Sequence, residues 1–189
     1  SRDGRYVAYA SYATDLVAGD TNDSQDILRW DRLTDTTVLV TQDLVDNPAN
    51  DDSFDPSISG DGSVVAYSSE ATDLAFNDTN GASDVFAWRA ATGNSALVSV
   101  DDGGQIADGP SYSGLVSADG EHVAFSSNAT DLVAGDTNGT RDTFVRDLDE
   151  FLAEFGSRGP NEWDVLADTW ETNPDLALAL IDRMRLLPE

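Results

Sequence analysis

Cysteine and lysine are absent from this 189-residue sequence, and histidine occurs once. Without cysteine the chain has no disulfide framework, no thiol nucleophile and no zinc–thiolate site, and its redox compartment cannot be read from the sequence. Without lysine, Schiff-base chemistry and a lysine phosphate clamp are excluded. No apolar run reaches the roughly 20 residues of a membrane-spanning helix, so we expect no membrane insertion.

Positive charge is scarce throughout. Ten arginines stand against 36 acidic residues, for a formal net charge of −26, and aspartate outnumbers glutamate by 29 to 7. Such a surface repels phosphate backbones and anionic lipids, so nucleic acid is a poor partner and cations are good ones. The aspartate excess has two explanations, adaptation to high salt and a fold with many Asp-rich turns. We prefer salt adaptation, because residues 149–189 lack the repeated turns described next and still hold ten acids against three arginines.

The chain repeats itself every 58 residues. Asp3-Gly4, Asp61-Gly62 and Asp119-Gly120 begin three copies of one pattern, in which fourteen positions are identical. A period of this length is typical of architectures whose units bury their apolar faces against one another. The repeats are residues 1–58, 59–116 and 117–148.

Each repeat predicts four short strands, which in the middle of the chain are Ser53–Ser59, Val64–Ser69, Asp84–Trp88 and Ala96–Val100. The second of these alternates Val65 and Tyr67 with small residues, so both of its faces suit burial. A sheet of this kind lies between neighbouring sheets, and radial repetition of four-stranded sheets is a β-propeller. The predicted fold class is all-β, a partial propeller of about two and two-thirds blades over residues 1–148. Alone, this number of blades does not close a ring.

The strand pattern ends after Leu148, and residues 149–189 predict an α-helical appendage. Leu148, Phe151, Leu152 and Phe155 recur at helical spacing, and Asn173-Pro174 begins a further helix. We expect this appendage to cover the open edge of the third blade.

The repeat resembles the TolB-type, WD-repeat-like propeller blade. The likeness covers residues 1–148 and lies in Ser-x-Asp-Gly before Tyr6-Val7-Ala8-Tyr9, in the Asp-Thr-Asn loop, and in Asp84-Val85-Phe86 at the start of the third strand. The resemblance implies export to the periplasm, the cell surface or the outside of the cell, although no signal peptide is present in this chain. It also implies binding to proteins or polymers, and in some members a separate catalytic domain.

The most specific candidate site is a seven-residue loop motif that recurs once in each repeat, at residues 20–26, 78–84 and 136–142. Oxygen side chains recur at its first, third and seventh positions, as in the first half of a calcium loop. The fifth position carries no carboxylate and the twelfth no glutamate, so we prefer Asx-turns as the explanation and keep calcium as the alternative. No cofactor is otherwise required. The candidate ligands are Asp20, Asn22, Asp26, Asp78, Asn80, Asp84, Asp136, Asn138 and Asp142.

Catalysis finds little support. His122 aligns with Val64 and Tyr6 at a strand start, which suits a rim imidazole better than a general base, and no nucleophile motif is present. We therefore expect a non-catalytic binding or scaffold module for a protein or polysaccharide partner, with self-association through open blade edges as a further expectation. Two alternatives stay open: the propeller part of a larger peptidase or polysaccharide-active enzyme, and a truncated fragment without a function of its own.

Overall fold

The structure, a computed structural model, describes residues 1–76 and 78–148. The helical appendage predicted for residues 149–189 lies outside these residues. Within the described part, no helix is long and apolar enough to cross a membrane.

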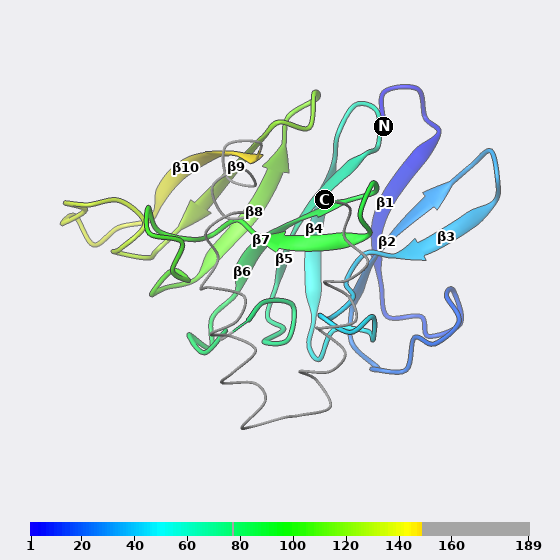
Figure 1. Cartoon of the computed structure of the whole chain (residues 1–189), viewed down its shortest axis with the longest axis horizontal. Helices are drawn as coiled ribbons and strands as arrows, with labels where there is room; N and C mark the ends of the chain where they lie inside the picture. Colours follow the sequence, from blue (N-terminus) through cyan, green and yellow to red (C-terminus); the bar gives the residue numbers. More distant parts are fainter. Residues whose placement is uncertain (77, 149–189) are drawn as a thin grey trace, which may run out of the picture.

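The described chain folds into three antiparallel sheets, which we call blades 1, 2 and 3 (Figure 1). Blade 2 has four strands and each of the other two has three. Strands that follow one another in the sequence are neighbours within every blade. Blade 1 contains β1 (Tyr6–Ser11), β2 (Asp26–Asp31) and β3 (Thr36–Leu39); blade 2 contains β4 (Ser53–Ile58), β5 (Val64–Ser69), β6 (Asp84–Arg89) and β7 (Asn94–Leu97); blade 3 contains β8 (Ser111–Val116), β9 (His122–Ser127) and β10 (Asp142–Asp147).

The Asp-Gly pairs form the tight turns that the sequence indicated. Between β4 and β5, Asp61 Oδ1 accepts hydrogen bonds from the Ser63 backbone N–H at 2.9 Å and from the Ser59 hydroxyl at 2.7 Å. These bonds hold the pKa of Asp61 at about 2. Gly62 follows with a φ of +77°, a conformation that favours glycine. The turn therefore needs both residues of the pair.

The sheets and the sequence repeats are out of phase. β4 belongs to the first 58-residue repeat by sequence, yet it pairs with β5 and completes blade 2. β8 joins blade 3 in the same way. Each complete blade thus takes its first strand from the end of the preceding repeat, so the connection between repeats is also a strand pairing.

The predicted bounds of the fourth strand, Ala96–Val100, were wrong, because the observed strand lies earlier in the sequence. The observed β7 starts at Asn94, directly after the turn at Gly93, whose φ is +73°, and ends at Leu97. The regular ladder stops there because the backbone N–H groups of Val98 and Ser99 both point to the Val85 carbonyl, at 2.7 and 3.4 Å. The chain then leaves the sheet.

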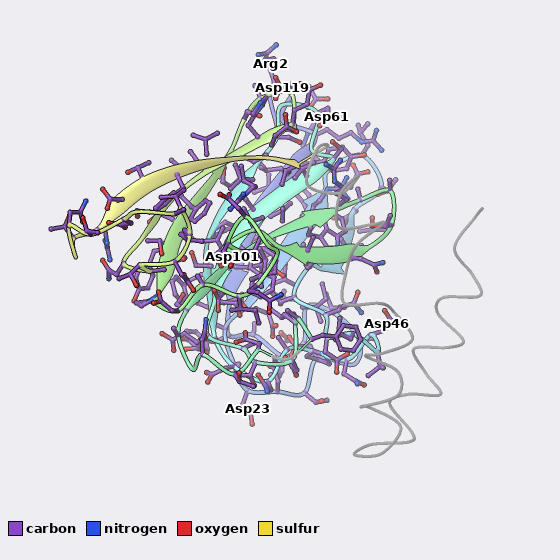
Figure 2. All side chains as sticks on the ribbon, turned by 60° about the vertical axis from the view of Figure 1, so that its left-hand side comes forward. Arg2, Asp23, Asp46, Asp61, Asp101 and Asp119 are labelled. Atoms are coloured by element: carbon purple, nitrogen blue, oxygen red, sulfur yellow. The ribbon has the colours of Figure 1, made fainter. Side chains whose placement is uncertain are left out.

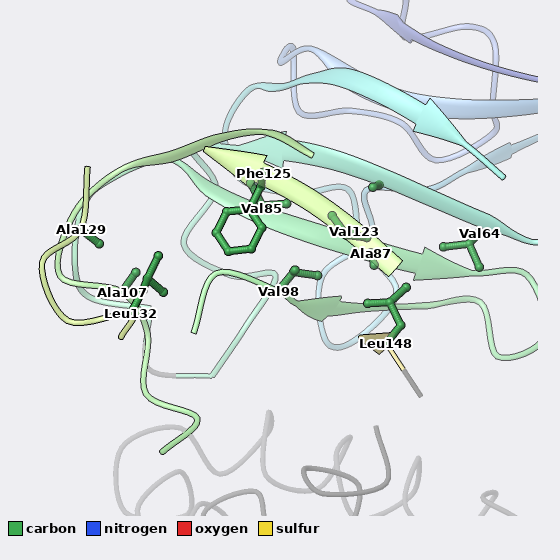
Figure 3. Packing of buried hydrophobic residues seen from close by; sticks show 11 residues of the cluster. Val64, Val85, Ala87, Val98, Ala107, Val123, Phe125, Ala129, Leu132 and Leu148 are labelled. Atoms are coloured by element: carbon green, nitrogen blue, oxygen red, sulfur yellow. The ribbon is translucent and has the colours of Figure 1, made fainter. Parts of the chain in front are cut away.

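Two hydrophobic cores lie between the blades rather than inside any one of them. One face of β5, with Val65 and Tyr67, packs on residues of blade 1 such as Ile27. Its other face, with Val64 and Ala66, packs with blade 3 residues such as Val123 and Phe125 (Figure 3). All six residues of β5 are buried, which confirms that this sheet is sandwiched between its neighbours. The chain is a partial β-propeller.

Equivalent side chains show what a neighbouring blade contributes. Val65 in blade 2 is fully buried, whereas Val7, its equivalent in blade 1, is 43% exposed. Ala87 is 3% exposed, whereas Val145, its equivalent in blade 3, is 66% exposed. The middle blade buries both faces, while each outer blade buries one.

Long loops and short turns lie at opposite ends of the blades, because the strands alternate in direction. Figure 2 shows Arg2, Asp61 and Asp119 together at the short-turn end and Asp23 at the opposite end. At the short-turn end, backbone hydrogen bonds join successive blades, from Arg2 N to Gly60 O and from Gly60 N to Ala118 O, both at 2.8 Å. The candidate loops lie at the other end.

Candidate cation-binding loops

The three candidate loops connect β1 to β2, β5 to β6 and β9 to β10. They are residues 12–25 after β1, 70–83 after β5 and 128–141 after β9. The seventh-position aspartates Asp26, Asp84 and Asp142 are the first residues of β2, β6 and β10. Each loop therefore delivers one carboxylate to the start of a strand.

The asparagine of each loop closes an Asx-turn, as the sequence favoured. Asn80 Oδ1 accepts a hydrogen bond from the Ala82 backbone N–H at 2.8 Å, and Asn22 and Asn138 make the equivalent bonds to residues 24 and 140. The amide nitrogen of Asn80 donates to Ala107 O at 3.0 Å and to Asp84 Oδ2 at 2.9 Å. The asparagine oxygens therefore serve the loop backbone, and the carboxylates are the groups left for a cation.

The aspartates that begin β2 and β6 join these strands to the segments that follow β3 and β7. Asp26 Oδ1 accepts a 2.6 Å hydrogen bond from the Thr41 hydroxyl, and Asp84 Oδ1 accepts one of the same length from the Ser99 hydroxyl. Each hydroxyl oxygen also accepts the backbone N–H of the residue after its aspartate, Ile27 or Val85. All four side chains in these pairs are buried.

Sequence reasoning missed Thr41 and Ser99. The signal was available, because each hydroxyl lies 15 residues after its aspartate and the pairs are one repeat apart. Ser99 lies inside the predicted strand Ala96–Val100 and Thr41 has no predicted role, so the prediction makes no use of this spacing. The hydroxyls link the candidate loops to the sheet.

The first-position aspartates are buried without a complete set of partners. Asp20 is 6% exposed and Asp78 is 7% exposed, and Oδ1 of each makes no hydrogen bond among the described residues. Asp26 Oδ2, in a fully buried side chain, is likewise without a hydrogen-bond partner in the described chain. Burial raises the pKa of Asp26, the side chains of Thr41 and Asn22 oppose this shift, and the nearby charge of Asp20 raises the pKa further.

The third loop is more open. Asp136 and Asp142 are partly exposed, and Asn138 is exposed. Asp136 Oδ1 accepts the Asn138 backbone N–H at 3.2 Å, while Asn138 donates to Asp142 Oδ2 at 2.9 Å. The same sequence motif therefore gives enclosed carboxylates in blades 1 and 2 and partly exposed ones in blade 3.

A separate group lies at the short-turn end. Asp119, Glu121 and His122 place one ligand atom each within 4.8 Å of one another, and this is the only such group of three acidic or histidine side chains in residues 1–76 and 78–148. Asp119 and Glu121 are exposed, and the equivalents of Glu121 and His122 in blade 2 are Ser63 and Val64. His122 Nε2 lies 3.7 Å from Asp147 Oδ2. His122 therefore occupies the strand start, as predicted.

The raised pKa of Asp84 predicts that the stability of the fold depends on pH. Burial raises the pKa of Asp84 to about 6 from 3.8, against the opposing hydrogen bonds from Ser99 and Asn80. The folded state then holds a proton that the unfolded state has lost, so the free energy of unfolding falls by about 2 kcal/mol as pH rises from about 4 to 6. We expect Asp84→Asn to remove this part of the slope in urea denaturation without calcium. The smaller slope left in that variant comes from Asp26, Asp73 and Asp78, whose pKa values burial also raises.

Asp61→Asn is the matched control for this measurement. The pKa of Asp61 is lowered to about 2, so its titration affects stability only below about pH 4. The control should keep the full slope between pH 4 and 6. An unchanged slope in the Asp84→Asn variant would contradict the prediction.

A family model described as the rifampicin phosphotransferase fourth domain matches residues 113–189. The described part of that stretch consists of blade 3. No curated protein sequence matches the chain.

Several solved structures are similar to the chain. TolB from Acinetobacter baumannii has a TM-score of 0.44 and 19% identity, over 77% of this chain and 27% of that protein. The tricorn protease has a TM-score of 0.46 and 15% identity, over 78% and 13%. Hydrazine synthase of Kuenenia stuttgartiensis has a TM-score of 0.48 and 17% identity, over 87% and 43%. The chain spans less than half the length of each of these proteins.

Proposed function

We propose that this propeller portion is a binding module whose partner is a protein with a basic surface. The observation that carries the proposal is the uneven charge of its two ends. The four long segments opposite the short turns, which we call the acidic end, hold twelve acidic residues and one arginine. The acidic end comprises residues 12–25, 40–52, 70–76 with 78–83, and 128–141.

The short-turn end carries charges of both signs. Its turns carry Arg2, Arg5 and Arg32 beside five acidic residues. A one-sign patch on a rigid scaffold steers an oppositely charged partner and sets its orientation. The likeness of the repeat to TolB-type blades supports a protein partner, and it supports a location in the periplasm, at the cell surface or outside the cell. The excess of acid over the whole chain supports adaptation to high salt.

The proposal can be tested with a ten-residue arginine peptide and two charge-matched variants. The acidic-end variant combines Asp15→Asn, Asp23→Asn and Glu70→Gln, and the control combines Asp3→Asn, Asp35→Asn and Glu121→Gln. All six side chains are exposed, and each variant removes three negative charges. We expect the acidic-end variant to bind the peptide at least about fivefold more weakly and the control to change less than about twofold, by fluorescence anisotropy at low salt.

Equal weakening in the two variants would overturn the proposal. In that case the peptide would respond to net charge alone, and the acidic end would have no special role. Asp23 has a φ of +58°, which asparagine also adopts readily, so its substitution leaves the loop intact.

A further inference from the structure

Two buried carboxylates of the first loop lie close together with unmatched oxygens. Asp20 is 6% exposed and Asp26 is fully buried, and each has one oxygen atom without a hydrogen-bond partner among the described residues. Removing an ionised carboxylate from water is unfavourable unless it is paired, and a second carboxylate nearby increases the cost. A cation or a shared proton would offset this cost, and within residues 1–76 and 78–148 no arginine forms an ion pair with either residue.

A third carboxylate adds to the negative field of this loop. The charge of Asp52 also acts on Asp26. Asp52 itself is committed, since Oδ1 accepts the Gln25 backbone N–H at 2.7 Å and Oδ2 accepts the Tyr12 hydroxyl at 2.9 Å. Asp52 therefore adds to the negative electrostatic potential at Asp26 but has no free oxygen to offer to a bound ion.

Blade 2 repeats the arrangement in a weaker form. Asp78 Oδ1 is unmatched like that of Asp20, but Asp84 Oδ2 accepts the Asn80 amide at 2.9 Å. The position equivalent to Asp52 is Pro110, which has no charge. Of the loops in the described chain, the first has the most negative surroundings, because the charges of both Asp20 and Asp52 act on Asp26.

We propose that Asp20 and Asp26 bind one calcium ion at the start of β2. Calcium prefers several hard oxygen ligands and tolerates irregular coordination, which suits a pair of carboxylates in a short loop completed by carbonyl oxygens and water. The asparagine at the third position is a structural neighbour rather than a ligand, because its oxygen accepts the Ser24 backbone N–H at 3.0 Å. This site is independent of the proposed partner.

Calorimetric titration of the full chain with calcium chloride at pH 7, after removal of metal with a chelator, tests the proposal. We expect saturable binding below millimolar calcium and a rise in Tm on saturation, because the ion binds the folded state. Asp20→Asn should weaken the binding at least about tenfold, since ligand charge sets calcium affinity. Asp136→Asn, the same change in the open third loop, should alter it less than about twofold.

Four results would overturn the assignment. They are no binding up to millimolar calcium, equal loss in Asp136→Asn, an equal rise in Tm with sodium chloride at matched ionic strength, and equal binding of magnesium. The first would mean that the pair shares a proton instead of a metal ion. Since Asp20→Asn removes no described hydrogen bond of the Asp20 Oδ1 atom, it is preferred over Asp26→Asn, which disturbs the bond to Thr41.

Discussion

Replacing Phe86 by alanine is expected to lower the free energy of unfolding by about 3 to 5 kcal/mol, which is the usual cost of truncating a buried phenylalanine. Phe86 is fully buried in the core between blades 1 and 2. Its ring stacks on that of Tyr67, with centroids 5.7 Å apart. Urea denaturation followed by tryptophan fluorescence measures the change.

Phe144→Ala is the matched control. Phe144 lies one repeat later and stacks on Phe125 at the same 5.7 Å, but it is only partly buried in the core between blades 2 and 3. We expect its truncation to cost about 1 to 2 kcal/mol, because less apolar surface is lost from the core. If the two variants are equally destabilised, then burial between blades is not what stabilises these phenylalanines.

Replacing Gly62 by alanine is expected to cost about 2 to 5 kcal/mol, more than its positive φ alone explains. A Cβ atom at Gly62 would overlap Cδ2 of Tyr6 and lie 2.8 Å from its Cβ atom. These atoms are at the base of the tyrosine side chain, so a rotation of the ring does not relieve the clash. The substitution therefore acts on the contact between blades 1 and 2.

Gly4→Ala separates this contact from the backbone effect. Gly4 occupies the same turn position with a φ of +67°, and a Cβ atom there meets nothing within 4 Å. Its cost should be about 1 to 2 kcal/mol, from the left-handed backbone conformation. Gly120, where the added atom would lie 3.1 Å from Val64 Cγ2, should fall between the two. Thermal unfolding of the three variants gives the order, and equal shifts in Tm would contradict it.

Much of the fold was predictable because the repeat encodes it locally. The Asp-Gly turns fixed the hairpins, and the alternation in β5, which runs over Val64–Ser69 as predicted, indicated a strand buried on both faces. The phase between repeats and sheets also followed, because the turn at Gly62 predicted that Ser53–Ser59 and Val64–Ser69 belong to one four-stranded unit. The phase depends on the pairing of β4 with β5, across this turn.

The candidate loops were predictable in position but not in detail. The recurrence of aspartate and asparagine located them, and the Asx-turns followed from ordinary side-chain chemistry. The burial of Asp20 and the partial exposure of Asp136 could not be read from identical motifs, because burial depends on which segments pack over each loop in the folded chain. Likewise, Thr41 and Ser99 become partners of Asp26 and Asp84 only when the sheet brings them together.

The cores shared between blades have a consequence for assembly. Every blade joins the next by two different faces, so the interface is heterologous, like the head-to-tail contact between subunits of a ring or a filament. An interface of this type always leaves one face of each kind uncovered, here the faces of Val7 in blade 1 and Val145 in blade 3. Closure into a circle would bury both. The same geometry lets a repeat be added at either end without changing the kind of face that the end presents.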